Sequence, residues 1–62
     1  MSDGPVTYLV TLETPRGRAE IEVKSMMGPD VAGRRARVAA VHQHWGDLDE
    51  IEVVSVEELD QS

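Results

Sequence analysis

The sequence contains no cysteine and no phenylalanine, and its aromatic residues are one tyrosine and one tryptophan. The absence of cysteine excludes a disulfide framework and a thiolate-bound metal cluster. No apolar run approaches the roughly 20 residues that a membrane-spanning helix needs. A chain of 62 residues is long enough for one small domain with a thin core. We therefore expect a single domain, residues 1–62, without a membrane segment.

The N-terminal residues Met1–Pro5 have neither a basic start nor an apolar stretch, so no secretory signal is predicted. A chain without thiols is compatible with a reducing compartment, and we expect a soluble, cytoplasmic protein. Apolar residues make up 40% of the chain and charged residues 29%. This balance is typical of a folded domain rather than of a disordered segment.

Two segments with alternating apolar and polar residues predict a β-hairpin. Residues 6–13 and residues 18–25 alternate with period two, and Thr14-Pro15-Arg16-Gly17 between them is a turn sequence. The apolar side chains predicted to share one face are Val6, Tyr8, Val10 and Leu12 in the first strand and Ala19, Ile21 and Val23 in the second.

A helix is predicted over residues 29–44. Gly28-Pro29-Asp30 is a typical helix start, and Gly46 is expected to end the helix as a left-handed cap. At 100° per residue, the apolar arc contains Val31, Val38, His42 and Trp45, with Val41 on one flank and Ala32, Ala36 and Ala39 on the other.

Residues 50–56 predict a third strand, and the termini 1–4 and 58–62 are expected to fray. The element order ββαβ favours an α+β fold with a three-stranded antiparallel sheet in the order 2-1-3 and the helix on one face. The face without the helix is expected to expose Leu9, Val54 and Val56. A second subunit is the simplest cover for such a face, so a homodimer is predicted, through this face or an edge strand.

Charge is distributed unevenly along the chain, whose net charge is −6. All six cations lie within residues 16–37. Arginines at the hairpin tip and on the helix form a candidate phosphate-contacting patch, but the net charge opposes nucleic-acid binding, and the preferred interpretation is a solvated face. The arginines of this candidate patch are Arg16, Arg18, Arg34, Arg35 and Arg37.

Residues 38–62 contain seven acidic side chains and no lysine or arginine. This segment could imitate a nucleic-acid backbone or bind a basic partner, although acidic residues on an edge strand also prevent edge-to-edge pairing. The candidate acidic surface consists of Asp47, Asp49, Glu50 and Glu52.

No motif predicts catalysis. His42 and His44 are the sole histidines, and a separation of two residues on a helix directs their side chains about 160° apart, so they could not share one metal ion there. No nucleophile, base and orienting group occur in a known arrangement, and one helix on a three-stranded sheet offers little concavity. We therefore expect no enzyme activity, no cofactor and no metal site.

Trp45 is the candidate anchor for a partner, although a thin core also needs its largest side chain. Met26 and Met27 are interpreted as filler at the edge of the core or, if exposed, as an adaptable contact surface.

The chain also resembles a group of known proteins in its pattern of hairpin, helix and last strand. The pattern is Thr7-Tyr8-x-Val10-x-Leu12-Glu13-Thr14-x-x-Gly17, then Ile21-Glu22-Val23, an alanine-rich helix, Trp45-Gly46 and a valine-rich last strand. It is similar to the short, uncharacterised ββαβ accessory proteins of bacteriophages and prophages of high-GC bacteria. The resemblance implies a small protein that binds a host or viral macromolecule, and it implies no site residues.

The sequence thus predicts a non-enzymatic protein-interaction module with a protein partner of unknown identity. The predicted contact surface is the arginine side of the helix together with Trp45 or, alternatively, the acidic last strand. A nucleic-acid binder that uses the arginines is the first alternative, and an acidic nucleic-acid mimic or inhibitor is the second.

Overall fold

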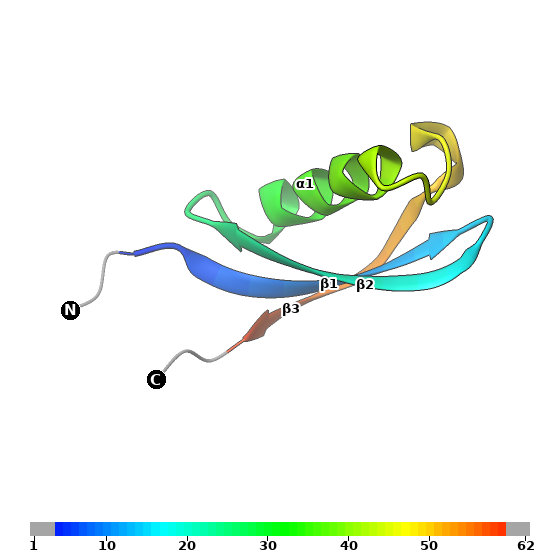
Figure 1. Ribbon diagram of the computed structural model, residues 1–62. Coiled ribbons are helices and arrows are strands. Elements are labelled where there is room, and N and C mark those ends of the chain that lie inside the picture. Colours follow the sequence, from blue (N-terminus) through cyan, green and yellow to red (C-terminus); the bar gives the residue numbers. More distant parts are fainter. Residues whose placement is uncertain (1–3, 60–62) are drawn as a thin grey trace.

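The computed structural model describes residues 4–59. Its elements are the strands β1 (Val6–Thr14) and β2 (Gly17–Ser25), the helix α1 (Pro29–His42), the short 3-10 helix η1 (Leu48–Glu50) and the strand β3 (Glu52–Leu59). The sheet has the order β2-β1-β3 and both strand pairs are antiparallel. The helix α1 lies across one face of this sheet (Figure 1). The predicted fold class, topology and helix placement are confirmed.

The hairpin forms where the alternation and the turn sequence place it. Val10 pairs with Ile21 on the helix side of the sheet, and the register runs without a break to Thr14 and Gly17. The Thr14 hydroxyl donates to the Gly17 carbonyl at 2.6 Å and accepts from the Arg16 N–H at 3.1 Å. The turn is therefore closed by its own side chain.

The last strand begins and ends later than predicted. Glu50, the predicted first residue of the strand, belongs to η1 instead, because its carboxylate accepts the Asp47 N–H at 3.0 Å and its N–H donates to the Asp47 carbonyl at 2.9 Å. At the other end, Glu58 and Leu59 pair with β1, so the prediction that they fray is wrong. Residues 1–3 and 60–62 lie outside the described residues, and Gly4 is an exposed bend before β1.

A register shift in β3 changes which valines face the helix. Ser55 pairs with Thr11 and Val53 pairs with Leu12, so Val54 is the extra residue of a β-bulge and is 48% exposed. Val56 pairs with Val10 on the helix side. The prediction that Val56 shares the opposite face with Leu9 is wrong, because strict alternation does not survive the bulge.

The helix buries a different face from the one predicted. Ala32, Ala36 and Ala40 are fully buried, whereas Val38 is 43% exposed and His42 is exposed. Small side chains allow the helix axis to approach the sheet closely, and the large side chains of the core come mainly from the strands and from Ile51. The buried cluster consists of Tyr8, Val10, Leu12, Ala32, Ala36, Ala40 and Ile51.

The helix ends at His42, two residues earlier than predicted. His44 takes a left-handed conformation with φ 66°, its N–H donates to the Val41 carbonyl, and the Trp45 N–H donates to the Ala40 carbonyl, both at 3.0 Å. These two bonds form a Schellman motif in which His44 stands where glycine is usual. The prediction that Gly46 is the cap is wrong. Gly46 instead allows a close approach, because a Cβ there would lie 2.8 Å from Pro15 Cδ.

Replacing His44 by glycine is expected to stabilise the fold by about 1 kcal/mol, because a left-handed conformation strains residues that carry a Cβ. Arg16 bonds the backbone carbonyl of residue 44, so that contact survives the substitution. The control is His42→Gly, which places glycine in the last helical turn and is expected to lower stability. Thermal unfolding followed by circular dichroism measures both changes. An unchanged or lower Tm for H44G would contradict the assigned cap.

Candidate functional site

The candidate arginines do not form one patch. Arg16 donates to the His44 carbonyl at 3.0 Å, Arg18 pairs with Glu13 at 2.8 Å, and Arg35 donates to the Lys24 carbonyl at 3.3 Å. Residues 18 and 24 of β2 are six positions apart, which is about 20 Å along a strand. The hairpin-tip arginines therefore lie at one end of the molecule and Arg35 contacts the other.

Arg37 is a structural residue. It is half-buried, and its guanidinium donates from Nε to the Ile51 carbonyl at 3.1 Å and from Nη2 to the Leu48 carbonyl at 2.8 Å. These bonds join α1 to η1 and to the start of β3. The Arg34 guanidinium, in contrast, makes no hydrogen bond or ion pair to any other described residue.

Trp45 is half-buried and packs against the core, which supports its role in closing one end of the domain. With Arg16 and Gln43 it also lines an open hollow of about 380 Å³. Met26 and Met27 are both 71% exposed, so the structure favours a contact surface over core filler for them. They form part of a second hollow, at the end of the molecule where β2 leads into α1.

His42 lies at the end of α1 and His44 lies beyond it, and both are exposed. Among residues 4–59, no three His, Asp or Glu side chains are placed to hold a metal ion.

The four candidate acidic residues gather around η1 and the start of β3. All four are exposed, and Glu50 uses its carboxylate to close the turn at Asp47. The sheet face without the helix carries further acids. On this face Leu9 lies between Glu22 of β2 and Glu57 of β3, so carboxylates flank it on both sides.

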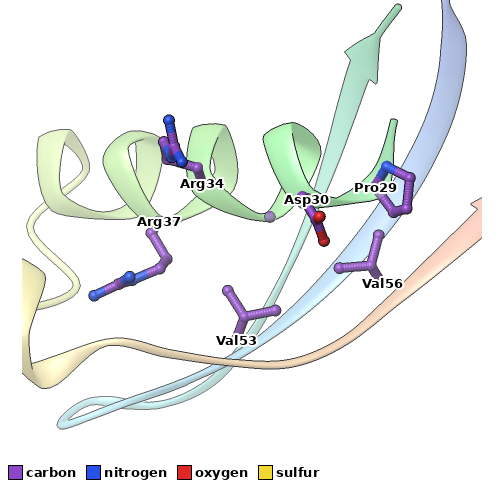
Figure 2. A pocket seen from close by; sticks show the side chains of 7 residues that line it. Pro29, Asp30, Arg34, Arg37, Val53 and Val56 are labelled. Carbon is purple, nitrogen blue, oxygen red and sulfur yellow. The ribbon is translucent and has the colours of Figure 1, made fainter. Parts of the chain in front are cut away.

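A groove lies between α1 and β3. Its volume is about 290 Å³, and it is defined here as the α1–β3 groove. Figure 2 shows Val53 and Val56 pointing from β3 toward the helix, with Asp30 near one end and Arg37 toward the other. The head of Arg34 points away from the two valines in the same view. The lining residues are Pro29, Asp30, Gly33, Arg34, Arg37, Val53 and Val56.

Gly33 keeps this groove open. A Cβ at Gly33 would lie 3.6 Å from Val56 Cγ2 and 3.7 Å from the methyl carbons of Val53, which is ordinary van der Waals contact. Packing therefore does not require glycine at this position. Glycine inside a helix lowers stability by about 0.5–1 kcal/mol relative to alanine. Gly33 thus weakens the helix, and its lack of a side chain leaves a hollow above Val53 and Val56.

Both apolar and charged residues line the groove. Its floor is apolar, the Arg37 guanidinium already bonds two backbone carbonyls, and Asp30 is an exposed carboxylate on the first turn of α1. A neighbouring hollow of about 460 Å³ shares Arg37 and Val53 and extends the surface toward Asp49, Glu50 and Glu52. An apolar side chain fits the floor, and a cation complements the acids around it.

Sequence reasoning singled out the arginines and the acidic segment but did not identify the groove. The available signal was Gly33, a glycine within an otherwise alanine- and arginine-rich helix. The partners of Gly33 could not be inferred, because Val53 and Val56 share the helix side only through the bulge at Val54.

None of the helices in residues 4–59 has the length and apolar character required to cross a membrane. Comparisons of the chain with models of known protein families, with curated proteins and with solved structures gave no match.

Proposed function

We propose that this chain is a cytoplasmic, non-enzymatic protein-interaction module that binds its partner in the α1–β3 groove. The observation that carries the proposal is Gly33, which weakens the helix and leaves open a hollow that alanine would partly fill. Stability given up at a position without a packing reason is typical of functional surfaces. The resemblance to bacteriophage accessory proteins supports the same class of function.

The two alternatives have less support. Four of the five candidate arginines donate to acceptors in their own chain, and they are spread over both ends of the molecule. A nucleic-acid backbone would also meet a net charge of −6. The acidic segment is consistent with a mimic, but its Glu50 is engaged within η1.

The homodimer stays a prediction with a weaker basis, because Val56 does not lie on the face that a second subunit would cover. Two β3 edges would also place acidic side chains opposite one another, since β3 carries three glutamates and no cation.

Photo-crosslinking tests the proposed contact surface. A photoreactive residue is placed at Arg34, on the rim of the groove, and in a control at Arg35, which contacts Lys24 instead. In lysate of the cells that make the chain, we expect one protein adduct from position 34 and a much weaker one from position 35. The adduct should disappear when Gly33→Leu fills the groove. Adducts that are equal at both positions, or that survive G33L, would contradict the proposal.

Gly33→Ala is expected to raise the free energy of unfolding by about 0.5–1 kcal/mol and to weaken the crosslinked complex. The gain comes from helix propensity, and the loss comes from the methyl group placed between Val53 and Val56. Ala39→Leu is the matched control, because Ala39 is half-buried and lies about 120° round the helix from Gly33. Urea denaturation and adduct yield measure the two effects. A stabilised G33A chain with undiminished adduct would remove the argument from Gly33.

A further inference from the structure

The free edge of β3 borders the α1–β3 groove. In the sheet order β2-β1-β3, the strand β3 pairs on one side with β1, and none of the other described strands pairs with its opposite side. An edge strand presents a row of backbone N–H and C=O groups that can pair with another strand. Because Val53 and Val56 of this strand form the groove floor, a segment added at this edge would project every second side chain toward the groove.

The charges around this edge have one predominant sign. Glu57 and Glu52 lie on the open face of β3, Glu58 lies on its helix side, and Asp30 lies at one end of the groove. The cations that line the groove are Arg37, which bonds two carbonyls, and Arg34, whose head points away from the valines. A strand with basic side chains therefore complements this edge, and a second copy of β3 does not.

The other edge of the sheet lacks this character. The outward positions of β2 carry both signs, with Arg18 and Lys24 at the ends and Glu20 and Glu22 between them. A basic strand at that edge would meet like charges at both ends. Charge complementarity therefore favours the β3 edge.

We propose that the partner adds an extended, basic segment to the edge of β3, with its apolar side chains in the α1–β3 groove and its lysines or arginines on the open face, near Glu57 and Glu52. Main-chain hydrogen bonds supply the affinity in this mode of recognition, and the alternating side chains supply the specificity. The inference rests on the proposed function, and it specifies the conformation and the chemistry of the partner segment.

The probe is a fluorescent peptide of alternating lysine and valine, capped at both ends, with a glutamate–valine peptide as its charge control. Fluorescence anisotropy measures affinity, and amide chemical shifts map the site. We expect the lysine–valine peptide to bind and to shift the β3 amides, and the glutamate–valine peptide not to bind. Two further lysine–valine peptides carry N-methyl groups, one on the odd-numbered and one on the even-numbered backbone nitrogens. In an added strand, only one of these two sets of N–H groups faces β3. We expect methylation of that set to weaken binding at least tenfold and methylation of the other set less than threefold.

Two variants separate strand addition from general electrostatics. Glu57→Lys and Glu22→Lys change the net charge equally, and both residues flank Leu9 on the same face, at opposite edges of the sheet. We expect E57K to weaken binding at least tenfold and E22K less than threefold. Equal effects of the two variants, or of the two sets of N-methyl groups, would overturn the inference.

Further outcomes would also overturn it. These are a lysine–valine peptide that does not bind, shifts confined to β2, a dimer of the chain with β3 protected from hydrogen exchange, and an oligonucleotide that binds the same edge. A crosslink at position 34 that is lost in G33L would then still support the proposed function, whereas strand addition would be excluded.

Discussion

Leu12→Ala is expected to lower the free energy of unfolding by about 2–5 kcal/mol, which is the usual loss for a buried leucine. Leu12 is fully buried and is the largest side chain in the core with no exposure. A domain of this size rarely has more than about 3–5 kcal/mol of stability, so much of the L12A population should be unfolded at room temperature. Circular dichroism, and urea denaturation followed by Trp45 fluorescence, measure the loss.

Leu9→Ala is the matched control for this prediction. Leu9 lies in the same strand, but it is half-buried on the sheet face that α1 does not cover. Its truncation leaves no enclosed cavity, and we expect a loss of about 1 kcal/mol. Equal losses for L9A and L12A would mean that the open face is covered in solution, as a homodimer through this face requires. Light scattering on the same samples would detect such a dimer.

Ala36→Asp is expected to prevent folding, because it places an unpaired carboxylate between α1 and the sheet. Ala36 is fully buried, and removing an uncompensated charge from water costs several kcal/mol. Val38→Asp, only two residues along the same helix, is expected to change stability by less than about 1 kcal/mol, since Val38 is 43% exposed. Circular dichroism spectra and denaturation curves of the two variants distinguish them.

The pair also tests which face of α1 is buried. Helical periodicity alone places Val38 on the arc that faces the core and the alanines to one side of it. A folded A36D together with an unfolded V38D would mean that Val38, and not Ala36, faces the sheet. The assignment of the α1–β3 groove would then be wrong. The expected order of stability is V38D above A36D by more than about 2 kcal/mol.

The sequence predicted two residues of the candidate site, Arg34 and Arg37, but neither Gly33 nor the geometry of the groove. The sequence identified the arginines, and the structure shows that Arg16, Arg18, Arg35 and Arg37 contact their own chain. Such contacts join residues up to 28 positions apart, and no local pattern encodes them. The acidity of the last strand was visible in the sequence, whereas its position beside the groove was not.

The sequence by itself determined the element order, the hairpin and the strand order of the sheet. Alternation with period two, a proline–glycine turn and the length of each segment are local properties, and one connection through a helix leaves few topologies for them. These features do not depend on which neighbours a side chain eventually contacts.

The tertiary structure decided three further features: the bulge at Val54, the buried face of α1 and the left-handed cap at His44. Each of these features involves contacts between segments that are distant in the sequence. The helix can bury alanine in place of valine because Tyr8, Leu12 and Ile51 already fill the core, and β3 bulges so that both Val53 and Val56 reach the helix. Packing depends on contacts between residues that are far apart in the sequence. For this reason the groove could be identified only from the tertiary structure.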